Sequence, residues 1–182
     1  LKSALLARWA RGPRWGPDRV SAREPLAALL YTHAVAVSRE WHAIDRNRAL
    51  GSAACGTDVG TRATFGLDPP PVTDPALLAA TSVPFAVLLT NASRASKLWP
   101  DARWRLVQRE LRARGLHSLL FAGSAGETEA TRRRAEGMTD ARLAPRSGLD
   151  QVAAVLARAR VVVGLDTGLT HLSAALGTPT LG

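Results

Sequence analysis

The sequence is short of several residue types, and each shortage excludes a class of protein. One cysteine, Cys55, stands among 182 residues, so no internal disulfide can form and a cytoplasmic setting is favoured. Only 5% of the residues are aromatic. No basic stripe is interleaved with stacking aromatic residues, which argues against a nucleic-acid-binding protein. No apolar run reaches the roughly 18 residues that a membrane span needs.

Several catalytic and cofactor motifs are also missing. The sequence has no G-x-G-x-x-G after a strand, no G-x-x-x-x-G-K-[ST] and no G-x-S-x-G, which excludes the common dinucleotide, P-loop and hydrolase patterns. His33, His42 and His117 have no partners at metal-ligand spacing. We therefore predict no protein-bound metal and no cofactor.

What the sequence does contain is positive charge and enough apolar surface for a core. Hydrophobic residues make up 46% of the chain and the formal net charge is +9. All but two of the basic residues are arginines, the exceptions being Lys2 and Lys97. A solvated basic surface accounts for part of this charge, and an anionic partner is the alternative. An acidic lipid, a glycolipid or a nucleotide fits the sequence better than a nucleic acid.

The organisation of the chain suggests a piece of a two-domain protein. Both ends read as cut, because the chain starts at Leu1 and stops where a strand after residues 177–179 is expected to begin. Three successive prolines at 69–71 exclude a helix and a central strand, and favour a stiff connector. The chain length fits one large domain or one and a half, and these prolines mark the expected domain boundary.

Before the prolines the pattern is mostly helical. Ser21 and Glu24 have capping-box spacing, although Pro25 can equally mark the first turn of a helix. A second helix is predicted over residues 37–50, and its apolar face is expected to be core.

After the prolines, apolar strands alternate with helices. Strands are predicted at 85–90, 117–123, 141–144 and 161–165, and helices at 101–114, 127–136, 149–159 and after Gly168. This alternation predicts an α/β fold with a parallel, doubly wound sheet. Ligands of such sheets bind beyond the carboxyl ends of the strands.

The loops after the strands hold the candidate functional residues. Ser93, Arg94, Ser96 and Lys97 follow the first strand, just before a helix start, where cations and hydroxyls suit a diphosphate. The alternative for Lys97 is a solvated loop lysine.

The loop after the second strand ends in Glu127, which can accept both hydroxyls of a ribose or can simply complement the helix dipole. After the strand at 161–165, Asp166, Thr167 and Gly168 form a tight turn into a helix, where an anion is favourable. His171, one turn later, either joins that site or lies in the core.

Three segments together resemble the bacterial lipopolysaccharide heptosyltransferases. They are S-R-A-S-K-L-W-P (93–100), G-S-A-G-E (123–127) and V-G-L-D-T-G-L-T-H-L-S-A-A-L-G-T-P (163–179). Residues 12–31 and 42–50 resemble the branch that adds the first heptose. The resemblance implies two Rossmann-like domains of the B-type glycosyltransferase architecture, with ADP-heptose as donor and the Kdo region of lipid A as acceptor. It further implies that both domains are incomplete here: residues 1–80 would be the latter part of the N-terminal acceptor-binding domain, and residues 81–182 most of the C-terminal domain that binds ADP-heptose.

The resemblance also implies a role for each motif residue. Ser93 and Lys97 would contact the donor diphosphate, Glu127 the ribose, and the turn at Asp166, Thr167, Gly168 and His171 the heptose and phosphates. Lys97 would stabilise the leaving ADP as a catalytic group. Arg19 and Arg23 would meet the acidic acceptor, with surface salt bridges as the alternative. The resemblance further implies inverting heptose transfer at the cytoplasmic face of the inner membrane, with the protein bound peripherally.

Two departures from the family pattern qualify this expectation. Ala92 stands where relatives often have a first hydroxyl residue, so one phosphate contact is expected to be missing. The family's catalytic base is an aspartate that would lie upstream of Leu1, so we expect this piece to bind donor without turnover. A sibling transferase that adds a later heptose and a non-catalytic nucleotide-binding module are the alternatives.

Overall fold

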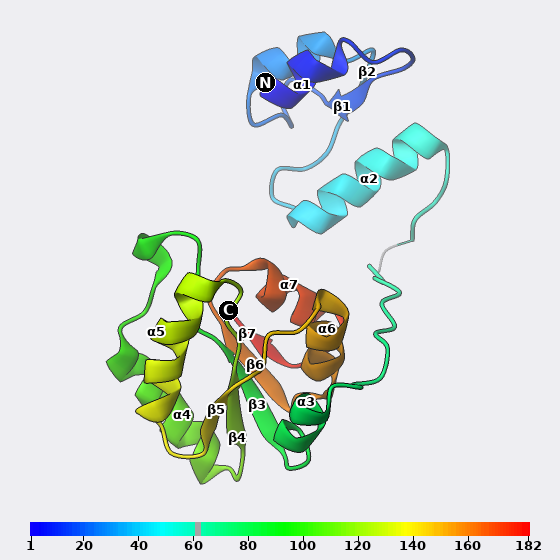
Figure 1. Ribbon diagram of the computed structural model, residues 1–182. Helices are drawn as coiled ribbons and strands as arrows, with labels where there is room; N and C mark the ends of the chain where they lie inside the picture. Colours follow the sequence, from blue (N-terminus) through cyan, green and yellow to red (C-terminus); the bar gives the residue numbers. More distant parts are fainter. Residues whose placement is uncertain (61–62) are drawn as a thin grey trace. The chain divides into compact units, whose positions relative to one another are not determined.

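The computed structural model describes residues 1–60 and 63–182, which form two compact units, Leu1–Thr64 and Phe65–Gly182 (Figure 1). The second unit therefore begins before the boundary expected at residue 80. The reason is that Val72 and Leu77 are buried in its core. The side-chain Oε1 of Gln151 also accepts a hydrogen bond from the Thr73 N–H at 2.8 Å, which ties the segment after the prolines to this unit.

The first unit is small, and its described residues, 1–60 and 63–64, include two short strands. Its elements are α1 (Lys2–Ala7), β1 (Trp15–Pro17), the 3-10 helix η1 (Pro25–Leu30), β2 (His33–Val35) and α2 (Ala43–Cys55). β1 and β2 pair in parallel, with Trp15 opposite His33, and the two rings stack with centroids 4.2 Å apart. His33 is thus engaged in ring stacking.

Of the two alternatives for residues 21–25, the one in which Pro25 marks the first turn is confirmed, whereas the expected bounds and burial of the second helix are wrong. Ser21 does not cap a helix, because its hydroxyl accepts the Val37 N–H at 2.8 Å; Pro25 instead opens η1. The second helix begins at Ala43, where the Nδ1 of His42 accepts the Ile44 N–H. No residue of α2 is buried, so its apolar face is not core in the part of the chain that the structure describes.

The second unit is the doubly wound α/β fold expected from the alternating pattern. Its elements are α3 (Pro75–Ala80), β3 (Phe85–Leu89), the 3-10 helix η2 (Ala95–Lys97), α4 (Asp101–Ala113), β4 (His117–Leu120), α5 (Ala125–Glu136), β5 (Ala141–Leu143), α6 (Leu149–Arg158), β6 (Val161–Gly164), α7 (Gly168–Ala175) and β7 (Thr180–Leu181). All five strands are parallel, in the order β5-β4-β3-β6-β7.

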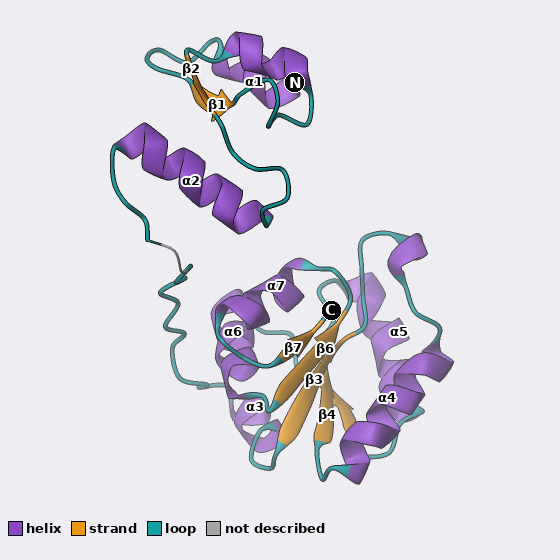
Figure 2. Ribbon diagram, turned by 180° about the vertical axis from the view of Figure 1, so that it is seen from behind, coloured by secondary structure: helices purple, strands orange, loops and turns teal. Residues whose placement is uncertain are grey.

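Helices cover both faces of this sheet (Figure 2). α3, α6 and α7 pack on one face around a core that includes Leu77, Val87 and Val155. α4 and α5 pack on the other face, where Trp104 and Leu120 are almost fully buried. β3 is buried on both faces, as a central strand of a parallel sheet must be. Among the described residues, no helix is long and apolar enough to cross a membrane.

Candidate functional site

The strand order places a crevice between β3 and β6. From β3 the chain goes to β4 on one side, whereas β6 lies on the other side of β3, so the loops that follow these two strands lead to helices on opposite faces. Such a topological switch point is where open α/β sheets bind ligands. The sequence-predicted loops at 91–100 and 166–168 are the two that flank it.

A cavity of about 540 Å³ lies at this edge of the sheet. Its walls combine the loop after β3, the loop after β4 and the start of α7. The lining residues include Ser93, Gly123, Glu127, Thr167 and Gly168. Four of the predicted site residues therefore share one cavity, as the edge rule for parallel sheets requires.

Lys97, Asp166 and His171 form a hydrogen-bonded cluster across the switch point. The Lys97 Nζ lies 2.6 Å from the Asp166 Oδ2, although 69 residues separate them in sequence. The His171 Nε2 lies 3.1 Å from the other oxygen of the same carboxylate. The hydrogen bond and positive charge of Lys97, followed by His171, hold the pKa of Asp166 below its usual value. The carboxylate is thus ionised, and two groups that can carry positive charge lie beside it.

The start of α7 is open. Thr167 is the residue that precedes the helix, and no side chain caps it. Thr170 does not provide a cap either, because its hydroxyl donates to the Leu165 carbonyl at 2.6 Å. Gly168 has free space where a Cβ would be. The first N–H groups of a helix have no partner within the helix, so this start can accept an anion such as a phosphate.

The start of α5 is capped by its own side chains. The Ser124 hydroxyl accepts the Glu127 N–H at 3.3 Å, and the Glu127 Oε2 accepts the Gly123 N–H at 2.8 Å and the Ser124 N–H at 3.3 Å. This reciprocal pair is a capping box. Glu127 therefore has a structural role at the helix start and also faces the cavity, so the two sequence-based interpretations of Glu127 are compatible.

The two predicted acceptor residues lie in the other unit. Arg19 and Arg23 are exposed in the turn before η1. No hydrogen bond or ion pair of either guanidinium is found within residues 1–60 and 63–182. Their proposed role stays a prediction.

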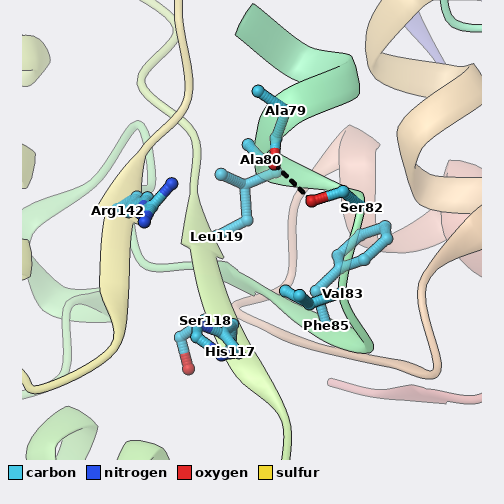
Figure 3. Close-up of a pocket in the computed structure, with 9 residues that line it drawn as sticks. All are labelled: Ala79, Ala80, Ser82, Val83, Phe85, His117, Ser118, Leu119 and Arg142. Carbon is cyan, nitrogen blue, oxygen red and sulfur yellow. Dashed lines mark hydrogen bonds between the residues drawn. The ribbon is translucent and has the colours of Figure 1, made fainter.

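A second, smaller cavity lies at the opposite edge of the sheet (Figure 3). It measures about 90 Å³ and lies among Phe85, His117 and Arg142 near the amino ends of β3, β4 and β5. Apart from these side chains it is lined mainly by small and apolar residues, and the Ser82 hydroxyl donates to the Ala79 carbonyl. Its size and its position away from the carboxyl ends make it a poor ligand site.

Metal ligands do not gather anywhere in the described part of the chain. No group of three His, Cys, Asp or Glu side chains is close enough to hold an ion there.

Two residues that the sequence patterns did not single out, Asn91 and Arg134, organise this edge of the sheet. Asn91 lines the cavity, and its Nδ2 donates to the Phe121 carbonyl at 3.1 Å and to the Thr131 hydroxyl at 2.9 Å. Arg134 is 11% exposed and bonds to Thr90 and Asp101. The only available signal for Asn91 was its place directly after a strand. Arg134 stands in a run of three arginines, and nothing in the sequence distinguishes it from the other two.

One family model and several curated proteins match this chain over all or nearly all of its length. The model of glycosyltransferase family 9 (heptosyltransferase) matches residues 1–182. The lipopolysaccharide heptosyltransferase 1 of Pseudomonas aeruginosa is 40% identical over 183 residues, which cover 100% of this chain and 50% of that protein. The protein of the same name from Escherichia coli K12 is 35% identical, over 98% of this chain and 56% of that protein. The chain spans about half the length of the curated relatives it matches.

Solved structures of a heptosyltransferase have the same fold as this chain. The E. coli heptosyltransferase WaaC with ADP superposes with a TM-score of 0.81 at 36% identity, over 98% of this chain and 57% of that chain. The same enzyme with ADP-2-deoxy-2-fluoro heptose gives a TM-score of 0.80 at 34% identity, over 98% of this chain and 56% of that chain. The α/β fold with two units, each carrying parallel strands, therefore matches the B-type glycosyltransferase architecture.

Proposed function

Since the chain belongs to glycosyltransferase family 9, the heptosyltransferases, we propose that it comes from an enzyme that transfers L-glycero-D-manno-heptose from ADP-heptose to the Kdo region of lipid A. This is the reaction that adds the first heptose in lipopolysaccharide inner-core biosynthesis. The identity of 35–40% to proteins named lipopolysaccharide heptosyltransferase 1 supports this choice.

The observation that carries the proposal is the cavity at the β3–β6 switch point. One wall has the open start of α7, which suits the diphosphate of ADP-heptose. Lys97 does not line the cavity, but it bonds to Asp166, the residue directly before Thr167 of that wall. Another wall has Glu127, which suits the ribose. WaaC, which shares the fold, has been solved with ADP and with an ADP-heptose analogue.

In the proposed reaction, an acceptor hydroxyl of Kdo loses its proton to a general base and its oxygen attacks the anomeric carbon of heptose. The bond from that carbon to the diphosphate oxygen breaks with inversion, and its electron pair leaves with ADP. Negative charge therefore grows on the diphosphate. Lys97 and the N–H groups at the start of α7 would stabilise that charge more strongly in the transition state than in the bound donor.

Calorimetric titration with ADP tests the donor half of the proposal. We expect binding, and we expect Lys97→Met to raise the Kd about 10- to 100-fold, because a charge-assisted hydrogen bond to phosphate contributes about 1.5–3 kcal/mol. Lys2→Met is a matched control, because it removes the only other lysine from a helix of the first unit. Absence of ADP binding by the folded chain would contradict the proposal.

An activity assay on the whole protein tests the acceptor. Turnover on Kdo-lipid A but not on the singly heptosylated lipid supports the proposed reaction. Turnover on the singly heptosylated lipid alone would assign the addition of a later heptose. ADP binding without turnover on either lipid would assign a non-catalytic nucleotide-binding module. Arg19→Gln and Arg23→Gln should raise the KM for Kdo-lipid A and leave the KM for the donor unchanged, because each removes a charge available to the acidic acceptor.

We also propose peripheral binding to the cytoplasmic face of the inner membrane, since the acceptor is an anionic lipid and the chain carries a net charge of +9. Binding to vesicles that contain anionic lipid should weaken as the salt concentration rises.

A further inference from the structure

Arg134 of α5 joins the two ends of the loop that carries Lys97. Its Nη1 donates to the Thr90 hydroxyl at 2.7 Å, and its Nε donates to the Asp101 Oδ1 at 2.7 Å. Thr90 directly follows β3 and Asp101 is the first residue of α4. The ten residues between them include Ser93 and Lys97. A single guanidinium therefore ties the start of this loop to its end.

The burial of Arg134 sets it apart from its neighbours. Its side chain is 11% exposed, whereas those of Arg132 and Arg133 are 56% and 70% exposed. The exposed arginines lie 3.7 Å and 3.8 Å from Glu129, at distances typical of weak surface pairs. A nearly buried guanidinium needs fixed partners, and its planar group presents Nε and Nη1 in a rigid geometry. Arg134 thus fixes Thr90 and Asp101 relative to each other.

The same helix also holds the first residue of the loop. The Asn91 Nδ2 donates to the Thr131 hydroxyl of α5 and to the Phe121 carbonyl after β4. α5 therefore contacts Thr90, Asn91 and Asp101 through two side chains one turn apart. Its own start carries Glu127, which lines the cavity. One helix thus connects the Glu127 wall with the loop of Ser93 and Lys97.

The loop has little regular structure of its own. Between Thr90 and Asp101 the only such element is the short η2. Fixing the ends of a segment lowers the number of conformations it samples. The contact between the Lys97 Nζ and the Asp166 Oδ2 depends on the conformation of this loop, since Lys97 lies within it. We propose that Arg134 is a positioning residue, which orders the loop so that Lys97 and Ser93 are held in place for the donor diphosphate.

The diphosphate part of this inference rests on the proposed function, whereas the ordering of the loop does not. Two measurements separate them. Amide hydrogen exchange of residues 91–99 reports the order of the loop without any ligand, and the Kd for ADP reports its use. Exchange within β4, at residues 117–120, serves as the internal reference for the fold.

The main variant is Arg134→Met, with Arg133→Met as the control that removes the same charge from an exposed position of the same helix. We expect Arg134→Met to speed exchange in the loop and to raise the Kd for ADP, each by about 10-fold, as loss of one or two charge-assisted bonds implies. Arg133→Met should change neither by more than about 2-fold. Arg134→Lys should give intermediate values, because a single ammonium cannot reproduce the two-directional guanidinium contact.

Asp101→Asn is the second variant, and it decides the question if Arg134→Met fails to fold. It removes the charge at one end of the contact and keeps the shape, so we expect smaller changes in the same direction. Support requires faster exchange confined to the loop together with weaker ADP binding. Unchanged exchange, faster exchange throughout the fold, or unchanged ADP affinity in a loosened loop would each overturn the positioning role. If the unaltered chain binds no ADP, the proposed function fails, and the exchange data alone show whether Arg134 orders the loop.

Discussion

Two helix starts at the same edge of the sheet, those of α5 and α7, differ in how they satisfy their N–H groups. Both follow a strand and a short turn, and both are preceded by a hydroxyl residue, Ser124 or Thr167. Three residues later α5 has Glu127, which completes a capping box, whereas α7 has Thr170, which bonds back to Leu165. The α5 start is closed by protein atoms and the α7 start is left for a ligand.

This difference teaches that a strand-turn-helix pattern alone does not identify an anion site. The helix dipole and the unpaired N–H groups exist at every helix start. What decides is whether the residues at the cap and three positions later use those groups themselves. At α5 the Ser124 hydroxyl accepts the Glu127 N–H, and the Glu127 carboxylate accepts the N–H groups of Gly123 and Ser124. An anionic ligand would therefore be repelled there. At α7 no side chain of the described residues caps the helix start, and the negative charge of the nearby Asp166 is paired with Lys97.

The largest effect is expected from a substitution that places a carboxylate at the uncapped start of α7. Thr167→Asp should raise the Kd for ADP about 100-fold, because the new carboxylate can cap α7 and repels the diphosphate. Calorimetry measures the affinity, and Thr167→Ser is the matched control that keeps a hydroxyl. If the Thr167→Asp variant is folded and binds ADP with unchanged affinity, the α7 start is not the phosphate site.

Removing the side-chain cap at the start of α5 should affect the stability of the fold more than the binding of ADP. Ser124→Ala removes one half of the capping box and should lower the free energy of unfolding by about 1 kcal/mol. Denaturant unfolding measures this change. The Kd for ADP should move by less than about 3-fold, because no phosphate contact is assigned to α5. A large loss of affinity at unchanged stability would reverse the assignment of the two starts.

Glu127 allows the structural and the ligand-binding roles to be separated. Glu127→Gln keeps an oxygen that can accept the Gly123 and Ser124 N–H groups, so the stability should stay within about 0.5 kcal/mol. The Kd for ADP should rise about 3- to 5-fold, because a neutral amide is a weaker acceptor for ribose hydroxyls than a carboxylate. If ADP affinity is unchanged in Gln and Ala variants alike, Glu127 is a capping residue alone.

The smallest effect concerns the charge beside the open start. Lys97→Met should raise the pKa of Asp166 toward its usual value, because the main hydrogen bond and charge that lower it are gone. Since the folded pKa is lowered, the pair stabilises the fold above the usual carboxyl pKa, and this contribution is lost as the solution becomes more acidic than about pH 4. Carbon-13 NMR titration of the carboxylate measures the shift. An unchanged pKa would mean that the Lys97–Asp166 contact does not persist in solution.

The fold of the second unit could be predicted because its signals are local. Apolar runs and helical periods marked β3, β4, β6 and α4 to within a few residues. The first unit was harder because distant partners decide its local structure. Ser21 had a capping-box neighbour, but its hydroxyl bonds to Val37, sixteen residues away. A pattern within four residues cannot detect such a competitor.

The candidate site was predictable in position and not in its contacts. The rule for parallel sheets brought the loops of Lys97, Glu127 and Asp166 to one edge. It could not show that Lys97 pairs with Asp166, since this depends on the course of an irregular loop. It could not separate Arg134 from Arg133 either, because only packing makes one of them buried.

Two of the five tryptophans, Trp99 and Trp104, lie within residues 65–182 and are neighbours. Trp99 is 42% exposed in the Lys97 loop, Trp104 is 1% exposed in the core, and their ring centroids are 5.3 Å apart. The Trp99 indole is therefore in contact with solvent and the Trp104 indole is buried, and their separation permits energy transfer between them. Any displacement of the loop changes the ratio of the two emissions. Once Trp9, Trp15 and Trp41 are replaced, this pair is a fluorescence reporter for movement of the loop that holds Lys97.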